Sequence, residues 1–173
     1  MRWEQLFADM EAQLAAGRLA DLRADVSELA RAERGSVMLS ARLRASVGQR
    51  LRVRVEGGEP VDGTVLEAAP EWLLLAAPAR RALVPLAAVA AVEGLATDSA
   101  PPPGVVESRL GLGQVLRALS RDRVGVRVAA GGSELIGRID RVGADHLDVV
   151  ELGTQGRASW SVPFERLRVV HEA

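Results

Sequence analysis

The side chains that could carry acid–base or nucleophilic chemistry are few in this sequence. His146 and His171 are its only histidines, and the chain has no cysteine. A catalytic triad needs a base beside an activated nucleophile, but the nearby Ser159 and Ser161 fall on an expected strand that lacks a nucleophile-elbow motif. The sequence therefore predicts surface or half-buried histidines and a protein that is not an enzyme.

Metal and nucleotide sites have little support from the residue types. Two histidines without cysteine do not complete a transition-metal site, and Asp140, Asp145 and Asp148, near an expected turn, lack the companion ligands of a calcium loop. Residues 111–113 (Gly-Leu-Gly) lack the third glycine of a dinucleotide-binding loop and follow a proline-rich segment instead of a strand. We expect no metal, no cofactor and no small-molecule substrate.

Arginines alternate with other residues in two segments of the chain, and no lysine is present. The members are Arg50, Arg52 and Arg54 in the first segment, and Arg117, Arg121, Arg123 and Arg127 in the second. On a strand, alternating positions share a face, so we expect Arg121, Arg123 and Arg127 to form one stripe that could meet phosphates. Such a stripe is also the ordinary solvent face of a strand, and the formal net charge is −1. We therefore expect at most weak, sequence-tolerant binding to RNA or DNA.

Trp72 and His146 occupy equivalent positions in two similar segments described below. A ring at that position could stack on a nucleic-acid base. A tryptophan within an apolar strand more often fills a core. Both readings of Trp72 remain open at this point.

These residues must be positioned by the elements around them, and the first element is helical. Trp3, Leu6, Phe7, Met10 and Leu14 follow the three- and four-residue spacing of one helix face. Gly17 interrupts this pattern, and two further apolar series follow. They comprise Leu19, Leu22, Val26 and Leu29, and then, after Gly35, Val37, Leu39, Leu43 and Val47.

The charged residues of the N-terminal segment are balanced. Seven acids and seven arginines lie between residues 1 and 46, which indicates a solvated face and not a basic arm. The apolar stripe formed by residues 3–14 has to pack against something, because a helix that short is not stable alone in water. We expect an amphipathic helix or a helical hairpin, with a second copy or another protein as the partner.

From Gly48 onward the apolar period changes to that of strands. Five short strands are expected within residues 48–93, with a turn at Gly57-Gly58, and this number in so short a segment favours a small closed barrel. Residues 94–108 contain three consecutive prolines and are expected to be an extended linker.

The pattern of the first module then returns, which indicates an internal duplication. Residues 47–55 align with 120–128, and later landmarks follow in the same order. These are Gly57-Gly58 with Gly131-Gly132, Gly63 with Gly137, Trp72 with His146, Val84-Pro85 with Val162-Pro163, and Val92 with Val170.

Each copy resembles the Sm-like small barrel, in which a short helix precedes five bent strands. The residues that carry the resemblance are the glycine turn, Gly63-x-Val65 and Leu83-Val84-Pro85-Leu86 in the first copy, and Gly137-x-Ile139 and Val162-Pro163-Phe164 in the second. The chain also resembles a group of uncharacterised actinobacterial proteins with a helical start followed by such a tandem. A PRC-type barrel is the alternative fold for each module.

The RNA pocket that the Sm-like resemblance would imply is carried over at no residue. RNA-binding Sm-like proteins place an asparagine in the first motif, and this chain has none. Leu83-Val84 and Trp160-Ser161 stand where an Arg-Gly pair would be. The resemblance therefore implies a fold and no activity.

We thus predict an α+β protein in which a helical segment precedes two duplicated five-stranded Sm-like barrels. The expected boundaries are 1–46 for the helical segment, 47–93 for the first barrel, 94–108 for the linker and 109–173 for the second barrel with its short leading helix. No apolar run reaches the length of a membrane span and no signal peptide is expected at the N-terminus, so we expect a cytoplasmic location and no membrane. The predicted function is that of an interaction or scaffold protein, with weak nucleic-acid binding as the alternative.

Overall fold

The computed structural model describes residues 2–78, 80–105, 107–151 and 158–173; within its helices, the side chains of residues 2–9, 12, 33, 34 and 107 are not described. The chain divides into two compact units, residues 1–37 and residues 38–173. Helices and antiparallel strands are both present, which confirms the α+β class.

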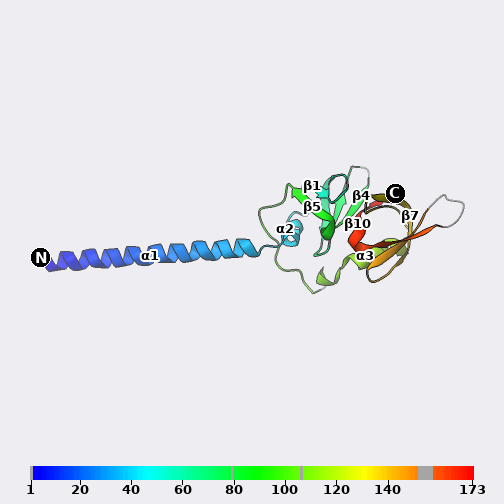
Figure 1. Ribbon diagram of the computed structural model, residues 1–173. Helices are drawn as coiled ribbons and strands as arrows, with labels where there is room; N and C mark the ends of the chain where they lie inside the picture. The colour runs from blue at the N-terminus through cyan, green and yellow to red at the C-terminus, as the bar shows by residue number, and fades with distance from the viewer. Residues whose placement is uncertain (1, 79, 106, 152–157) are drawn as a thin grey trace. The chain divides into compact units, whose positions relative to one another are not determined.

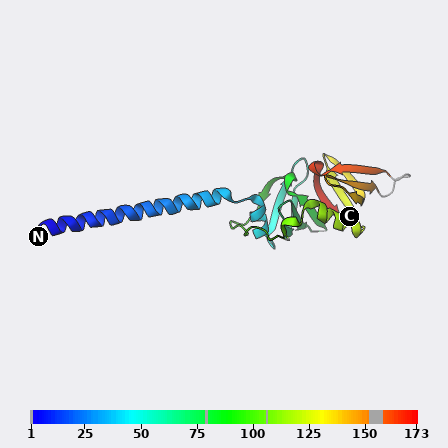
Figure 2. The same ribbon diagram turned by 90° about the horizontal axis from the view of Figure 1, so that it is seen from below.

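The first unit is a single helix, α1 (Arg2–Ser36), which runs without a break for 35 residues (Figures 1 and 2). It passes straight through Gly17, where the apolar pattern changes but the helix does not break, so the expected alternative of a helical hairpin inside this segment is wrong. A glycine within a helix costs only about 1 kcal/mol relative to alanine, and the many alanines, leucines and arginines around it are good helix formers. The helix ends one residue after Gly35, where the sequence predicts a break.

The second helix, α2 (Leu39–Ala45), belongs to the second unit. Leu43 is completely buried in a core cluster with strand residues, and Ser46 directly after the helix is also buried. The units therefore divide at residue 37, earlier than the expected boundary at residue 46.

Within the described residues, ten antiparallel strands form one sheet, accompanied by helix α3 (Leu112–Arg121) and three short 3-10 turns. The strands of the first half are β1 (Arg50–Val55), β2 (Val61–Ala68), β3 (Trp72–Ala76), β4 (Arg81–Pro85) and β5 (Val89–Glu93). The strands of the second half are β6 (Gly125–Ala130), β7 (Ser133–Val142), β8 (His146–Glu151), β9 (Ser159–Pro163) and β10 (Leu167–Glu172). The turns are η1 (Leu86–Ala88), η2 (Glu107–Arg109) and η3 (Phe164–Arg166).

The two halves of the sheet have the same strand order. The sequence across the sheet is β5-β1-β2-β3-β4 and then β10-β6-β7-β8-β9. β4 and β10 join the halves, with Leu83 opposite Val170 and Ala82 opposite His171. The pairing thus gives one continuous, open sheet that ends at β5 and β9, where the sequence analysis expected two separate closed barrels.

The strand registers of the two halves also correspond, but not with the alignment expected for the first strand. Leu51 lies opposite Gly63 in one half, and Val126 lies opposite Gly137 in the other. Val126 is therefore the counterpart of Leu51, two residues later than the alignment of 47–55 with 120–128 assumed. A two-residue slip leaves every side chain on the same face of the strand, so alternation alone could not detect it.

Two core clusters lie in the second unit, and each contains residues from both halves of the sheet. Trp72 and Leu83 of the first half belong to the cluster built around α3 and β6 to β8. Val169 of the second half belongs to the cluster built around Leu43 and β1 to β4. The halves therefore share their apolar cores across the β4–β10 junction.

The proline-containing segment between the halves, residues 94–108, is hydrogen-bonded to α2 and to Ser46 directly after it. The guanidinium of Arg42 donates two hydrogen bonds to the carbonyl oxygen of Ala96, at 3.0 and 2.9 Å. The hydroxyl of Ser46 accepts a hydrogen bond from the backbone N–H of Ala96 at 3.0 Å, and Arg44 donates to the carbonyl of Pro101. This segment is consequently packed against its own half and does not act as a free spacer.

A glycine in the same place on β2 and β7 lets the neighbouring strand come close. A Cβ atom on Gly63 would lie 2.7 Å from the carbonyl oxygen of Ala76, and one on Gly137 would clash with that of Val150. Both strands carry a register irregularity a few residues later, between Val65 and Glu67 and at the equivalent place in β7. The glycines thus permit the same bend in both halves.

Replacing either glycine should destabilise the second unit because no side chain can yield at these backbone contacts. We expect Gly63→Ala and Gly137→Ala each to lower the free energy of unfolding by about 1–3 kcal/mol in denaturant melts. The matched control is Gly104→Ala, where a Cβ meets nothing within 4 Å. Equal stability of all three variants would show that the close approach is absent in solution.

Candidate interaction surfaces

The most conspicuous surface feature is on α1. The described large apolar side chains of this helix are between 51% and 65% exposed: Met10, Leu14, Leu19, Leu22, Val26 and Leu29. At 3.6 residues per turn, Met10 and Leu14 lie about a third of a turn from the series that begins at Leu19. The helix therefore presents two apolar faces, one in each of its halves.

The sequence predicts five protein-interaction residues: Trp3, Leu6, Phe7, Met10 and Leu14. Met10 and Leu14 are exposed as that role requires, whereas the side chains of Trp3, Leu6 and Phe7 lie outside the described residues. The series from Leu19 to Leu29 has the same exposure but was not included among the site residues. Its three- and four-residue spacing already marks it as an apolar helix face in the sequence, although only residues 3–14 were predicted to contact another protein.

The first arginine stripe lies on β1 as expected. Arg50, Arg52 and Arg54 are exposed and alternate with buried residues along the strand. The guanidinium of Arg52 is held by the carboxylate of Asp62 at 2.8 Å, and this ion pair raises the pKa of Arg52. Arg50 and Arg54 remain as the exposed cations of this stripe.

The predicted second arginine stripe is wrong, because its residues do not lie along one strand. Arg121 is the last residue of α3, Arg123 lies in the turn after it with a positive φ of 52°, and only Arg127 is on a strand. The reason is the two-residue slip described above, because α3 extends over residues that the alignment assigned to a strand. Arg117 projects from α3 and donates a hydrogen bond to the carbonyl of Gly143 at 3.2 Å.

Trp72 and His146 lie in different environments despite their equivalent positions. Trp72 is 2% exposed, and its indole N–H donates a hydrogen bond to the carbonyl of Leu110 at 2.7 Å, so its ring is not available for stacking on a base. His146 is half-buried, with Nδ1 2.8 Å from Oδ1 of Asp145. This hydrogen bond lowers the pKa of the Asp145 carboxyl group.

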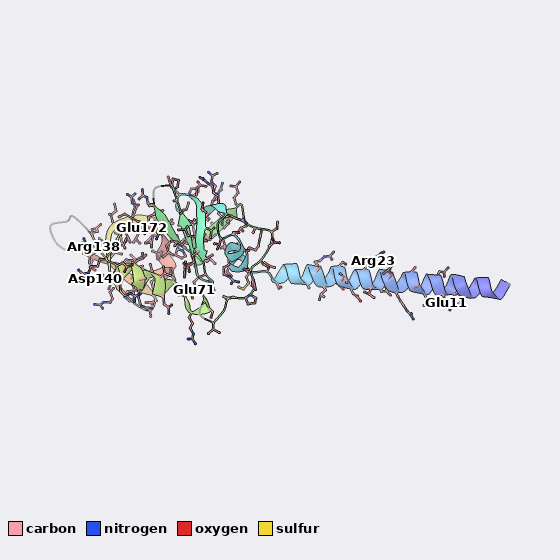
Figure 3. All side chains as sticks on the ribbon, turned by 180° about the vertical axis from the view of Figure 1, so that it is seen from behind. Glu11, Arg23, Glu71, Arg138, Asp140 and Glu172 are labelled. Atoms are coloured by element: carbon pink, nitrogen blue, oxygen red, sulfur yellow. The ribbon has the colours of Figure 1, made fainter. Side chains whose placement is uncertain are left out.

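Glu71, next to Trp72, makes a contact that the sequence analysis missed. Its carboxylate accepts a hydrogen bond of 2.8 Å from the backbone N–H of Leu112, at the first turn of α3 (Figure 3). A carboxylate there satisfies a free N–H group and matches the positive end of the helix dipole. Glu71 and Trp72 thus fix the start of the second half onto the first.

A groove of about 670 Å³ lies beside the β4–β10 junction, between the two glycine turns. Arg80, Arg127, Arg168 and His171 line it together with acidic residues. Arg127 is 3.3 Å from the carboxylate of Glu134, and Arg168 is 3.2 Å from that of Glu56. Acids therefore lie beside two of these cations, whereas Nε of Arg127 and Nδ1 of His171 are buried and make no hydrogen bond within the described part of the chain.

The two histidines and Ser161, which could have formed a catalytic set, each contact different residues. His171 lines the groove, His146 contacts Asp145, and the hydroxyl of Ser161 donates to Asp148 at 2.6 Å. Among the described residues, no three histidine, aspartate or glutamate side chains are grouped so that they could hold a metal ion. None of the helices in the described part of the chain is long and apolar enough to cross a membrane.

Comparison with known proteins adds no family to this picture. No protein-family model matches the sequence, and no curated protein is significantly similar to it.

One buried tryptophan, Trp72, and one exposed tryptophan, Trp160, provide a test of the core. Trp72→Phe should lower the free energy of unfolding by about 1–3 kcal/mol, because it removes buried volume and leaves the Leu110 carbonyl without its donor. Trp160, which is 52% exposed, is the matched control, and Trp160→Phe should change stability by less than about 0.5 kcal/mol. Denaturant melts of both variants decide this, and a larger effect at Trp160 would contradict the assignment of Trp72 to the core.

His171 should make stability depend on pH. Burial lowers its pKa below the usual 6.5, as do the charges of Arg80 and Arg127, whereas Glu134 raises it. The unfolded chain therefore binds a proton that folded His171 resists, so stability should fall as the pH drops below about 6.5, down to the folded pKa. Thermal melts between pH 7.5 and 5 should show a smaller loss of stability for His171→Gln than for the wild type. The same pH dependence in wild type and His171→Gln would contradict this.

Proposed function

We propose that this protein is a non-catalytic interaction protein in which the sheet unit is the folded platform and α1 makes the contacts. The observation that carries the proposal is the exposure of apolar side chains along both halves of α1. Fully burying a leucine, valine or methionine side chain contributes roughly 1.5–3 kcal/mol. Six such residues left in water favour a partner that covers them.

We further propose that the sheet unit is a tandem of two five-stranded modules of the Sm-like type, which the β4–β10 pairing joins into one open sheet. Five features support this interpretation: the shared strand order, the corresponding registers, the equivalent glycines, the irregularity that follows each glycine, and the proline before η1 and η3. A tandem of this type offers two related surfaces to partners, and its fold alone specifies no reaction.

The proposal is tested by capture from an extract of the source cell with the full chain as bait. Leu22→Glu with Val26→Glu places two carboxylates in the apolar series, and Ala20→Glu with Ser27→Glu places two elsewhere on the helix. We expect nuclease-resistant protein partners, including copies of the chain itself, to be lost with the first variant and retained with the second. Identical capture by both variants would show that α1 is not the contact element.

Weak, sequence-tolerant binding to RNA or DNA is the second candidate, and the exposure of Arg50 and Arg54 on one face of β1 favours it. Such binding would depend steeply on salt, because arginine–phosphate contacts would supply it. We expect Arg50→Ser with Arg54→Ser to remove any binding measured at low salt by fluorescence anisotropy. Binding that survives this change, or that is tight at high salt, would place the nucleic acid on another surface.

A further inference from the structure

The second half of α1 has the residue pattern of a coiled-coil seam. Ala15, Leu19, Leu22, Val26 and Leu29 are separated by four, three, four and three residues, which is the spacing of a and d positions in heptads. Leu19 and Val26 are then a positions, and the other three are d positions. The leucines and Val26 are all more than half exposed.

The charges beside this seam show which orientation of two paired helices is favoured. Arg18 and Asp25 occupy g positions, and Arg23 occupies an e position; Figure 3 shows Arg23 and Glu11, another g residue, on the helix. In a parallel pair, a g residue meets the e residue of the partner five positions on, so Arg18 would meet Arg23 of the other copy. Like charges therefore disfavour a parallel pair.

In an antiparallel pair, a positions face d positions, and g residues face g residues. When Leu19 faces Leu22 of the second copy, Ala15 faces Val26, and Leu29 faces position 12, which is also an alanine in the sequence. Arg18 of each copy then lies opposite Asp25 of the other, which gives two ion pairs along the g side of the seam. Glu11 and Arg23 come opposite alanines, Ala32 and Ala16, so no like charges meet at these positions.

Neighbouring antiparallel registers lack this complementarity. A shift by one heptad in one direction places Arg18 opposite Arg18 of the second copy, and Glu11 opposite Asp25. A shift in the other direction places Arg23 opposite Arg23 and Asp25 opposite Asp25. Only the register with Leu19 facing Leu22 combines apolar layers with opposite charges, and e and g charges are what set orientation and partner choice.

We propose that α1 pairs with α1 of a second copy of this chain as an antiparallel coiled coil in which Leu19 faces Leu22. This inference rests on the proposed function and names one partner for the series from Leu19 to Leu29. The face that carries Met10 and Leu14 is about a third of a turn away and stays free for another contact.

The absence of cysteine from the natural chain allows a direct test of orientation. Full-length chains with Ala15→Cys and with Val26→Cys are mixed and treated with a short thiol–thiol cross-linker. The antiparallel register predicts cross-links mainly between the two different variants. Cross-links mainly between identical variants would indicate a parallel pair and overturn the proposal.

Charge variants test the register by sedimentation equilibrium over a range of concentrations. Arg18→Asp places an acid opposite Asp25 and should weaken dimerisation by about tenfold, since two flanking pairs change sign. Arg18→Asp combined with Asp25→Arg restores opposite charges and should recover the wild-type value within about twofold. Arg31→Asp, at an outward f position, is the control and should leave dimerisation unchanged. Tighter dimerisation with Arg18→Asp would indicate Arg23 as its neighbour and a parallel pair.

Failure of this inference can be told apart from failure of the proposed function. A full chain that stays monomeric at every concentration, without cross-links, would overturn the pairing, even if Leu22→Glu with Val26→Glu still abolished capture of other proteins. Circular dichroism of each charge variant checks that α1 keeps its helix, so that a change in mass is not confused with unfolding.

Discussion

Backbone pairing between β4 and β10 is the interaction on which the second unit depends. Only through this pairing do the two sets of strands become one sheet, and Leu83 and Val169 then each reach the core cluster dominated by the other half. Trp72 and Glu71 add bonds from the first half to the start of α3. Because neither half completes its core alone, the halves should unfold together, and the surfaces on either side of the junction keep a fixed relation to each other.

Helix α1 differs from the sheet unit, in which the two halves bury their apolar side chains in shared cores. Its backbone hydrogen bonds are satisfied within the helix, but its described large apolar side chains are all more than half exposed. A helix gains most of its stability in water from packing of its apolar face, so these side chains are the part of the molecule that most needs a partner. The proposed assignment of a contact role to α1 and of a platform role to the sheet follows from this difference.

Much of this organisation could be predicted from periodicity, since the apolar spacing indicates the helix, the short strands and the repeat of Gly63 in Gly137. The pattern could not give the strand register, because a slip of two residues preserves the alternation of buried and exposed side chains. The slipped alignment placed Arg121 and Arg123 on a strand, whereas they belong to a helix end and a turn. Nor could it decide the role of Trp72, which depends on a carbonyl 38 residues away. The apolar seam of α1 was visible in the sequence, but its exposure depends on the tertiary structure.

Hydrogen exchange of the full-length chain at low and high protein concentration tests the central claim most directly. If α1 is held by contacts between copies, the protection of its amides should rise with concentration, while the amides of β4 and β10 keep the same high protection as the rest of the sheet. Protection of α1 that is already complete at the lowest concentration and does not change, or that is absent at the highest, would contradict the account.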